Sequence, residues 1–174
     1  MRTLADTFGI PLVDRDLAKI GVLAALEAKA KFLIMATLKA VAGYKSEQFI
    51  CLEKQQLAQL VAKLLTVTPT IDSALHDLVA EFDRVRIESH EVRHKFVHAL
   101  WASGDADSVV GRDIRRAESL APADLDDAMI KVAQLAQAAH ACAFRAAQLI
   151  VAGVLQEGED AKPAMFLGGR WVNL

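Results

Sequence analysis

Apolar residues recur at steps of three and four along the middle of the chain, and this spacing constrains the fold more than any other feature. Such steps place side chains on one face of an α-helix, so they predict a single helix from about Ile71 to Trp101 with one buried face. The series consists of Ile71, Leu75, Leu78, Phe82, Val85, Ser89, Val92, Phe96 and Leu100. Ser89 is its only polar member.

A second series steps by four and three, as in a heptad repeat, and is rich in small residues. Pro122 opens this segment, and the aspartates that follow it suit the positive end of a helix dipole. Small residues allow neighbouring helices to approach closely, so we expect a tightly packed helix here. The series consists of Leu125, Met129, Val132, Ala136, Ala139, Ala143, Ala146, Ile150 and Gly153.

Two further helices are predicted before these. The first runs from Asp14 to about Ala42, because acidic residues favour its start and Gly43 is a plausible stop. Its segment 32–35 is apolar on all sides, so we expect this helix to contact neighbours on more than one face. A shorter helix follows from about Glu47 to Leu65, with a break near Cys51.

The predicted fold class is all-α, an up-and-down bundle of about four long helices. The segments 109–111 and 113–114 are β-prone and suggest a small hairpin between the third and fourth helices. A length of 174 residues suits one domain, which we place at residues 1–158. Residues 159–174 are predicted to form a C-terminal arm.

Composition excludes several functional classes. The 20 Lys and Arg residues nearly balance 22 Asp and Glu residues, so the chain is not a strongly basic nucleic-acid-coating domain, although a local basic patch remains open. Cys51 and Cys142 have neither a metal-ligand spacing nor the density of a disulfide scaffold. The most apolar stretch, 22–41, is interrupted by one Glu and three Lys residues. We therefore expect no membrane span and a cytoplasmic protein.

The segment 88–101 carries the most informative polar residues, including three of the five histidines. His90, His94 and His98 are four residues apart and form a ridge on a helix, a spacing that can hold a transition metal. This ridge is almost opposite the apolar face, however, and needs ligands from another element. An exposed polar face is the simpler interpretation, and we expect neither a metal nor another cofactor.

The same segment reads Arg-polar-x-x-x-His at Arg93, His94 and His98. This pattern resembles the motif of the HEPN superfamily, all-helical domains that include metal-independent endoribonucleases. The resemblance covers roughly residues 10–155. It implies a homodimer with paired motifs that cleaves or binds RNA, together with an antitoxin protein in a toxin–antitoxin or defence system. It also implies that His98 is the acid or base, that Arg93 stabilises the phosphate and that His94 orients them.

Cleaving RNA without a metal ion needs a base for the 2′-hydroxyl, an acid for the leaving oxygen and a cation for the phosphate. Histidine, with a pKa near 6.5, can serve as base or acid, and arginine offers a permanently charged fork to phosphate oxygens. On an ideal helix, a five-residue offset separates Arg93 and His98 by about 140°. One copy therefore cannot easily present both to one phosphate unless the helix is distorted or a second copy takes part.

Basic residues near the motif are candidates for binding RNA. They face phosphates if the loop after Trp101 folds back onto the third helix. Acidic residues at positions 105, 107 and 113 dilute this charge, so a solvated loop is the competing interpretation. The candidates are Lys95, Arg112, Arg115 and Arg116.

A second class of function remains open, a non-catalytic helical module for oligomerisation or interaction. In that case Arg93 makes an ordinary ion pair, for example with an acidic residue on another helix. The interface would be the Ala-rich fourth helix or the segment 32–38.

Overall fold

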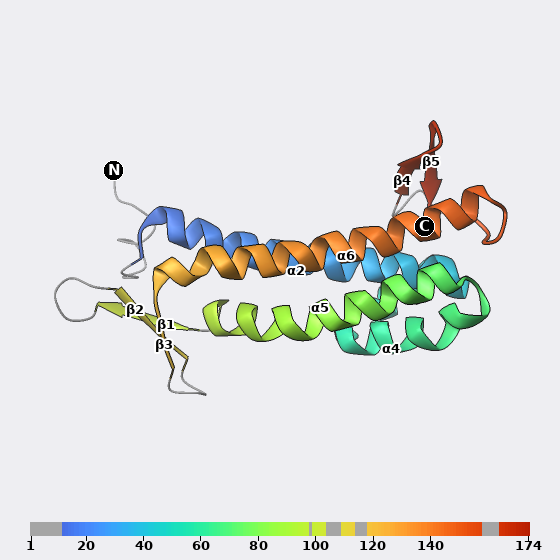
Figure 1. Ribbon diagram of the computed structural model, residues 1–174. Coiled ribbons are helices and arrows are strands. Elements are labelled where there is room, and N and C mark those ends of the chain that lie inside the picture. The colour runs from blue at the N-terminus through green and yellow to red at the C-terminus, as the bar shows by residue number, and fades with distance from the viewer. Residues whose placement is uncertain (1–11, 98, 104–108, 114–117, 158–163) are drawn as a thin grey trace. The chain divides into compact units, whose positions relative to one another are not determined.

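The computed structural model describes residues 12–97, 99–103, 109–113, 118–157 and 164–174. The predicted all-α bundle is confirmed, because long helices dominate these residues (Figure 1). Short 3₁₀ turns at Thr68–Thr70 and Pro122–Asp124 precede the last two helices. The helices are α2 (Asp14–Ala42), α3 (Ser46–Glu53), α4 (Leu57–Val67), α5 (Ser73–Val97) and α6 (Leu125–Val151).

The chain divides into two compact units, each built from two segments. The first unit consists of Met1–Glu27 and Arg86–Gln134, and the second of Ala28–Val85 and Leu135–Leu174. Helices α2, α5 and α6 each contribute residues to both units. Among the described residues, no helix is long and apolar enough to span a membrane.

Helix α2 has the predicted bounds, whereas the next predicted helix is two helices. Gln56 has an extended backbone and its N–H donates to the Gln59 side chain, so the chain restarts as α4 after a break at 54–56 rather than near Cys51. Helix α5 begins two residues later than predicted, because the Asp72 carboxylate accepts a hydrogen bond from the Leu75 N–H and caps it.

The predicted end of α5 at Trp101 is wrong, because the helix stops at Val97 and the chain continues as a strand. Three short strands form an antiparallel sheet in the order β1-β2-β3 (Figure 1). They are β1 (Leu100–Ser103), β2 (Val109–Asp113) and β3 (Glu118–Leu120). Antiparallel strands between the third and fourth long helices were predicted and are present, but the bounds differ: Val109–Asp113 is one central strand that pairs with both neighbours.

The first unit has its own apolar core beside this sheet. One face of α2, the end of α5 and the start of α6 bury their apolar residues together with one residue of β3. The Trp101 ring stacks on Phe96, with centroids 6.3 Å apart. This core therefore ties the sheet to the helices of the unit. Its buried members are Leu23, Phe96, Leu120, Leu125, Ala128 and Val132.

Gly111 lies directly against the Trp101 ring, so its replacement tests this packing. A Cβ at position 111 would come within 2.9 Å of the ring. We expect Gly111→Ala to lower the free energy of unfolding by about 1–3 kcal/mol, as overpacking does. In Gly21→Ala, the matched control on α2, the new Cβ meets nothing within 4 Å, and it should stabilise by about 0.5–1 kcal/mol. Urea unfolding measures the free energy of unfolding of both variants. Equal changes in the two would contradict the close packing of Gly111 against Trp101.

The second unit is built around a segment of α2 that is buried on every side. All eight residues from Ile34 to Val41 are buried, including the polar Thr37 and Lys39. The Thr37 hydroxyl donates to the Leu33 carbonyl one turn earlier. Helices α3, α4, α5 and α6 supply the apolar residues around this segment. The prediction that the first helix contacts neighbours on more than one face is confirmed.

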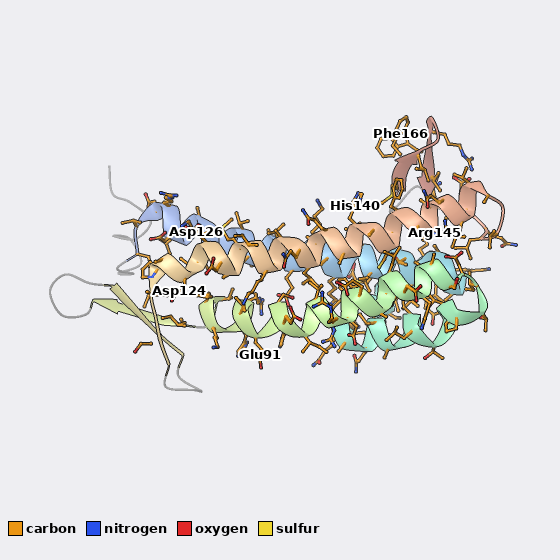
Figure 2. All side chains as sticks on the ribbon, viewed as in Figure 1. Glu91, Asp124, Asp126, His140, Arg145 and Phe166 are labelled. Atoms are coloured by element: carbon orange, nitrogen blue, oxygen red, sulfur yellow. The ribbon has the colours of Figure 1, made fainter. Side chains whose placement is uncertain are left out.

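The described part of the predicted C-terminal arm forms a hairpin of β4 (Ala164–Leu167) and β5 (Arg170–Asn173). The turn between the strands consists of two glycines with positive φ, a conformation that favours glycine. Val172 is buried with the small residues of α6. Phe166 and Trp171 pair across the strands on the exposed face, and Figure 2 shows Phe166 projecting from the hairpin.

Candidate functional site

The candidate site lies on the last turns of α5 in the first unit. The amphipathic pattern of the sequence sets its orientation, because Ser89 and Phe96 are buried while the His90 side chain is 60% exposed. Arg93 and His94 lie between these extremes and are partly exposed. Arg93 and His94 therefore lie at the margin of the buried face of α5, where solvent and a ligand can reach them.

Arg93 is paired with Glu27, which lies on α2 in the same unit. The Arg93 Nε is 2.6 Å from the Glu27 Oε2, and each side chain is 23% exposed. The Nε is shielded from solvent, and among the described residues it makes no hydrogen bond of good geometry. The contact is therefore an ion pair held by proximity and charge, in a place where solvent screens it less than at the open surface.

His90 lies beside this ion pair, and His94 stacks on His90. The His90 Nδ1 is 4.0 Å from the other oxygen of Glu27, and the His90 and His94 rings stack with centroids 6.0 Å apart. One carboxylate on α2 thus faces two side chains on α5, a permanently charged guanidinium and an imidazole. The arrangement offers a fixed cation beside imidazoles, which is the set of groups that acid–base chemistry on a phosphodiester needs.

The structure describes only some of the predicted site residues. Arg93 contacts Glu27, His94 stacks on His90, and Lys95 is half-buried on the same helix. Arg112 lies in β2, opposite Leu100 and Ser119, but its side chain is outside the described part of the chain. Three of the predicted residues lie outside the described residues altogether: His98, Arg115 and Arg116.

The end of α5 changes one geometric expectation. The angle of about 140° between positions 93 and 98 assumed a regular helix as far as Trp101. Helix α5 ends at Val97 instead, and Leu100 is already in a strand. Position 98 lies outside the described residues, so the angle between the two motif positions stays a prediction.

The metal hypothesis required a third ligand near His90 and His94. Within the described residues, no group of three His, Cys, Asp or Glu side chains has an arrangement that could hold a metal ion. The buried Cys142 is not a candidate nucleophile. Burial raises the pKa of the Cys142 thiol to about 12, so this thiol stays protonated and unreactive at neutral pH.

Glu27 is the site residue that sequence reasoning did not identify. The sequence did contain a signal, because Glu27 is the only acidic residue between Asp16 and Glu47 and interrupts a strongly apolar helix. A lone carboxylate on such a helix needs a charged or polar partner when it is partly buried. Which residue supplies that partner depends on how α2 and α5 pack in the first unit.

Comparison with known proteins found no matching family model, no matching curated protein and no matching solved structure. The interpretation of the site therefore rests on its residues and their geometry.

Proposed function

We propose that this chain is a HEPN-like domain that binds RNA and cleaves it without a metal ion, acting in the cytoplasm as a homodimer. The observation that carries the proposal is the partly exposed Arg93, fixed by Glu27 and adjacent to His94. The Glu27 contact uses the Nε, whereas four of the five N–H donors of a guanidinium belong to the two Nη atoms. Those donors are the ones suited to phosphate oxygens.

The proposed reaction assigns roles to three residues. His98 takes the proton from the 2′-hydroxyl of the RNA or gives one to the leaving 5′-oxygen. Arg93 stabilises the negative charge on the phosphorane, and His94 orients the two. Attack of the 2′-oxygen breaks the bond to the 5′-oxygen and leaves a 2′,3′-cyclic phosphate. In a homodimer, the two copies of the motif supply both the acid and the base. Lys95, Arg112, Arg115 and Arg116 are the proposed RNA contacts.

A non-catalytic interaction module is the second candidate, and the Arg93–Glu27 pair is the ion pair that this alternative predicted. The surfaces named for its interface fit less well. Ala139, Ala143 and Ala146 of the α6 series are fully buried within the chain's own core. In the segment 32–38, only Phe32 is exposed.

The first proposal also includes a setting: a toxin–antitoxin or defence system with an antitoxin protein as partner.

Cleavage of a pool of structured RNAs in EDTA tests the proposal. We expect EDTA-resistant cleavage by the wild type with 2′,3′-cyclic phosphate ends. Arg93→Ala and His98→Ala should each lose at least about 100-fold in rate, the usual contribution of such groups. Arg15→Ala and His140→Ala are matched controls, because these side chains are exposed elsewhere on the chain. Circular dichroism and light scattering confirm equal helicity and oligomeric state.

The possible results separate the two candidates. RNA that is bound but not cleaved would favour a binding module, and the absence of both binding and cleavage would overturn the RNA proposal. Cleavage that survives both substitutions would place the catalytic groups elsewhere on the chain.

A further inference from the structure

Glu27 is a carboxylate in a place where an RNA-binding site gains nothing from negative charge. It faces both Arg93 and His90, and it would repel a phosphate electrostatically. Its presence there needs another explanation than affinity. Because the proposed substrate is an anion, a residue that costs binding is useful to the site only if it improves the geometry of the reaction.

The geometry of the ion pair supplies this explanation. An arginine side chain is long, and fixing its guanidinium removes much of its rotamer freedom. Glu27 contacts the Nε, the donor nearest the backbone, and this ion pair restricts where the guanidinium can lie without using the Nη donors. His90, three residues before Arg93 on α5, is the other group facing this carboxylate.

We infer that Glu27 is a positioning residue for the proposed RNA cleavage: it holds the Arg93 guanidinium in the orientation that stabilises the transition state. This inference rests on the proposed function. Glu27 takes no proton and touches no reacting atom, and its effect passes through Arg93. We therefore expect that loss of the Glu27 carboxylate slows turnover without weakening RNA binding.

Glu27→Gln tests this role, because it keeps the side chain's length and removes only its charge. We expect kcat to fall about tenfold or more, as small misplacements of catalytic groups do, while KM stays unchanged or decreases because the site loses one negative charge. Asp126→Asn is the matched control. It makes the same chemical change in an ion pair to the same helix, with the Lys19 Nζ 2.8 Å from the Asp126 Oδ1. This control should leave kcat and KM unchanged.

A second measurement follows Arg93 directly and needs no RNA. The shielded Nε–H of Arg93 should give a slowly exchanging ¹H–¹⁵N signal, assigned by its loss in Arg93→Lys. The signal should persist in Asp126→Asn and shift or disappear in Glu27→Gln.

The outcomes distinguish this inference from the function on which it rests. If the wild type cleaves RNA and Glu27→Gln keeps the wild-type kcat and Arg93 signal, the positioning role is overturned and the proposed function stands. A fall in kcat of equal size in Asp126→Asn also overturns it, because the effect is then a general loss of structure. If the wild type neither binds nor cleaves RNA, the proposed function itself fails, and the positioning role fails with it.

Discussion

Replacing Phe82 with alanine should lower the free energy of unfolding by about 3–5 kcal/mol. Phe82 lies on α5 in the second unit, is fully buried, and belongs to the core around α2 and α4. Its removal takes a large apolar surface out of the core and leaves a cavity that the neighbouring helices fill only in part. At about 2–4 °C per kcal/mol for a chain of this length, the midpoint of thermal unfolding should fall by roughly 6–20 °C.

The control for this substitution is Ile87→Ala, five positions further along the same helix. Ile87 is 56% exposed, so its truncation should change the free energy of unfolding by less than about 0.5 kcal/mol. Thermal and urea unfolding, followed by circular dichroism, measure both variants. Similar losses of stability in the two variants would show that burial on α5 is not distributed as described.

Replacing Asp72 with alanine should also destabilise the protein, and the loss should depend on pH. Asp72 caps α5 through the Leu75 N–H and accepts two hydrogen bonds from Arg145, which lies on α6 (Figure 2). The cap alone is worth about 1 kcal/mol. The Arg145 and Leu75 hydrogen bonds, in that order of size, lower the pKa of the Asp72 carboxyl below 3.8.

A carboxyl group whose pKa is lower in the folded state binds protons more weakly there than in the unfolded chain. Its contribution to stability is therefore complete above the unfolded pKa, near 3.8, and is lost as the pH falls through the lower folded value. The wild type should accordingly exceed Asp72→Ala in stability at pH 7, and the difference should shrink below about pH 4. Asp77→Ala, at an exposed position on the same helix, provides the charge-matched control. A difference that stays constant down to pH 2.5 would show that the ionised carboxylate is not what stabilises α5.

The parts of the fold that follow from local sequence were predictable. Acidic residues at the start of α2 and Gly43 after its end mark both ends of that helix, and the stepped apolar residues give the buried faces of α5 and α6. The end of α5 was not predictable in the same way. Leu100 continues the helical spacing, yet it belongs to a strand whose partner is β2. That pairing depends on residues far along the chain, which local periodicity does not report.

The candidate site, like the fold, was predictable from the sequence only in part. Arg93 and His94 are neighbours in sequence, so a short motif was enough to single them out. Glu27 lies on a different helix, and only the packing of α2 against α5 in the first unit brings its carboxylate to Arg93. A motif describes one strip of one helix, whereas an ion pair between helices is a property of the tertiary structure.

The division of the chain into two units, each made of two separate segments, has a consequence for synthesis on the ribosome. The first unit needs residues 1–27 and 86–134 together, and all of 28–85 is made between them. At about 5–20 residues per second, the start of α2 waits roughly 3–12 s for α5 to supply its partners. During that time Leu23, which is fully buried in the finished fold, lacks the partners that later cover it. The N-terminal half of α2 is therefore a segment of the nascent chain that we expect a chaperone to bind.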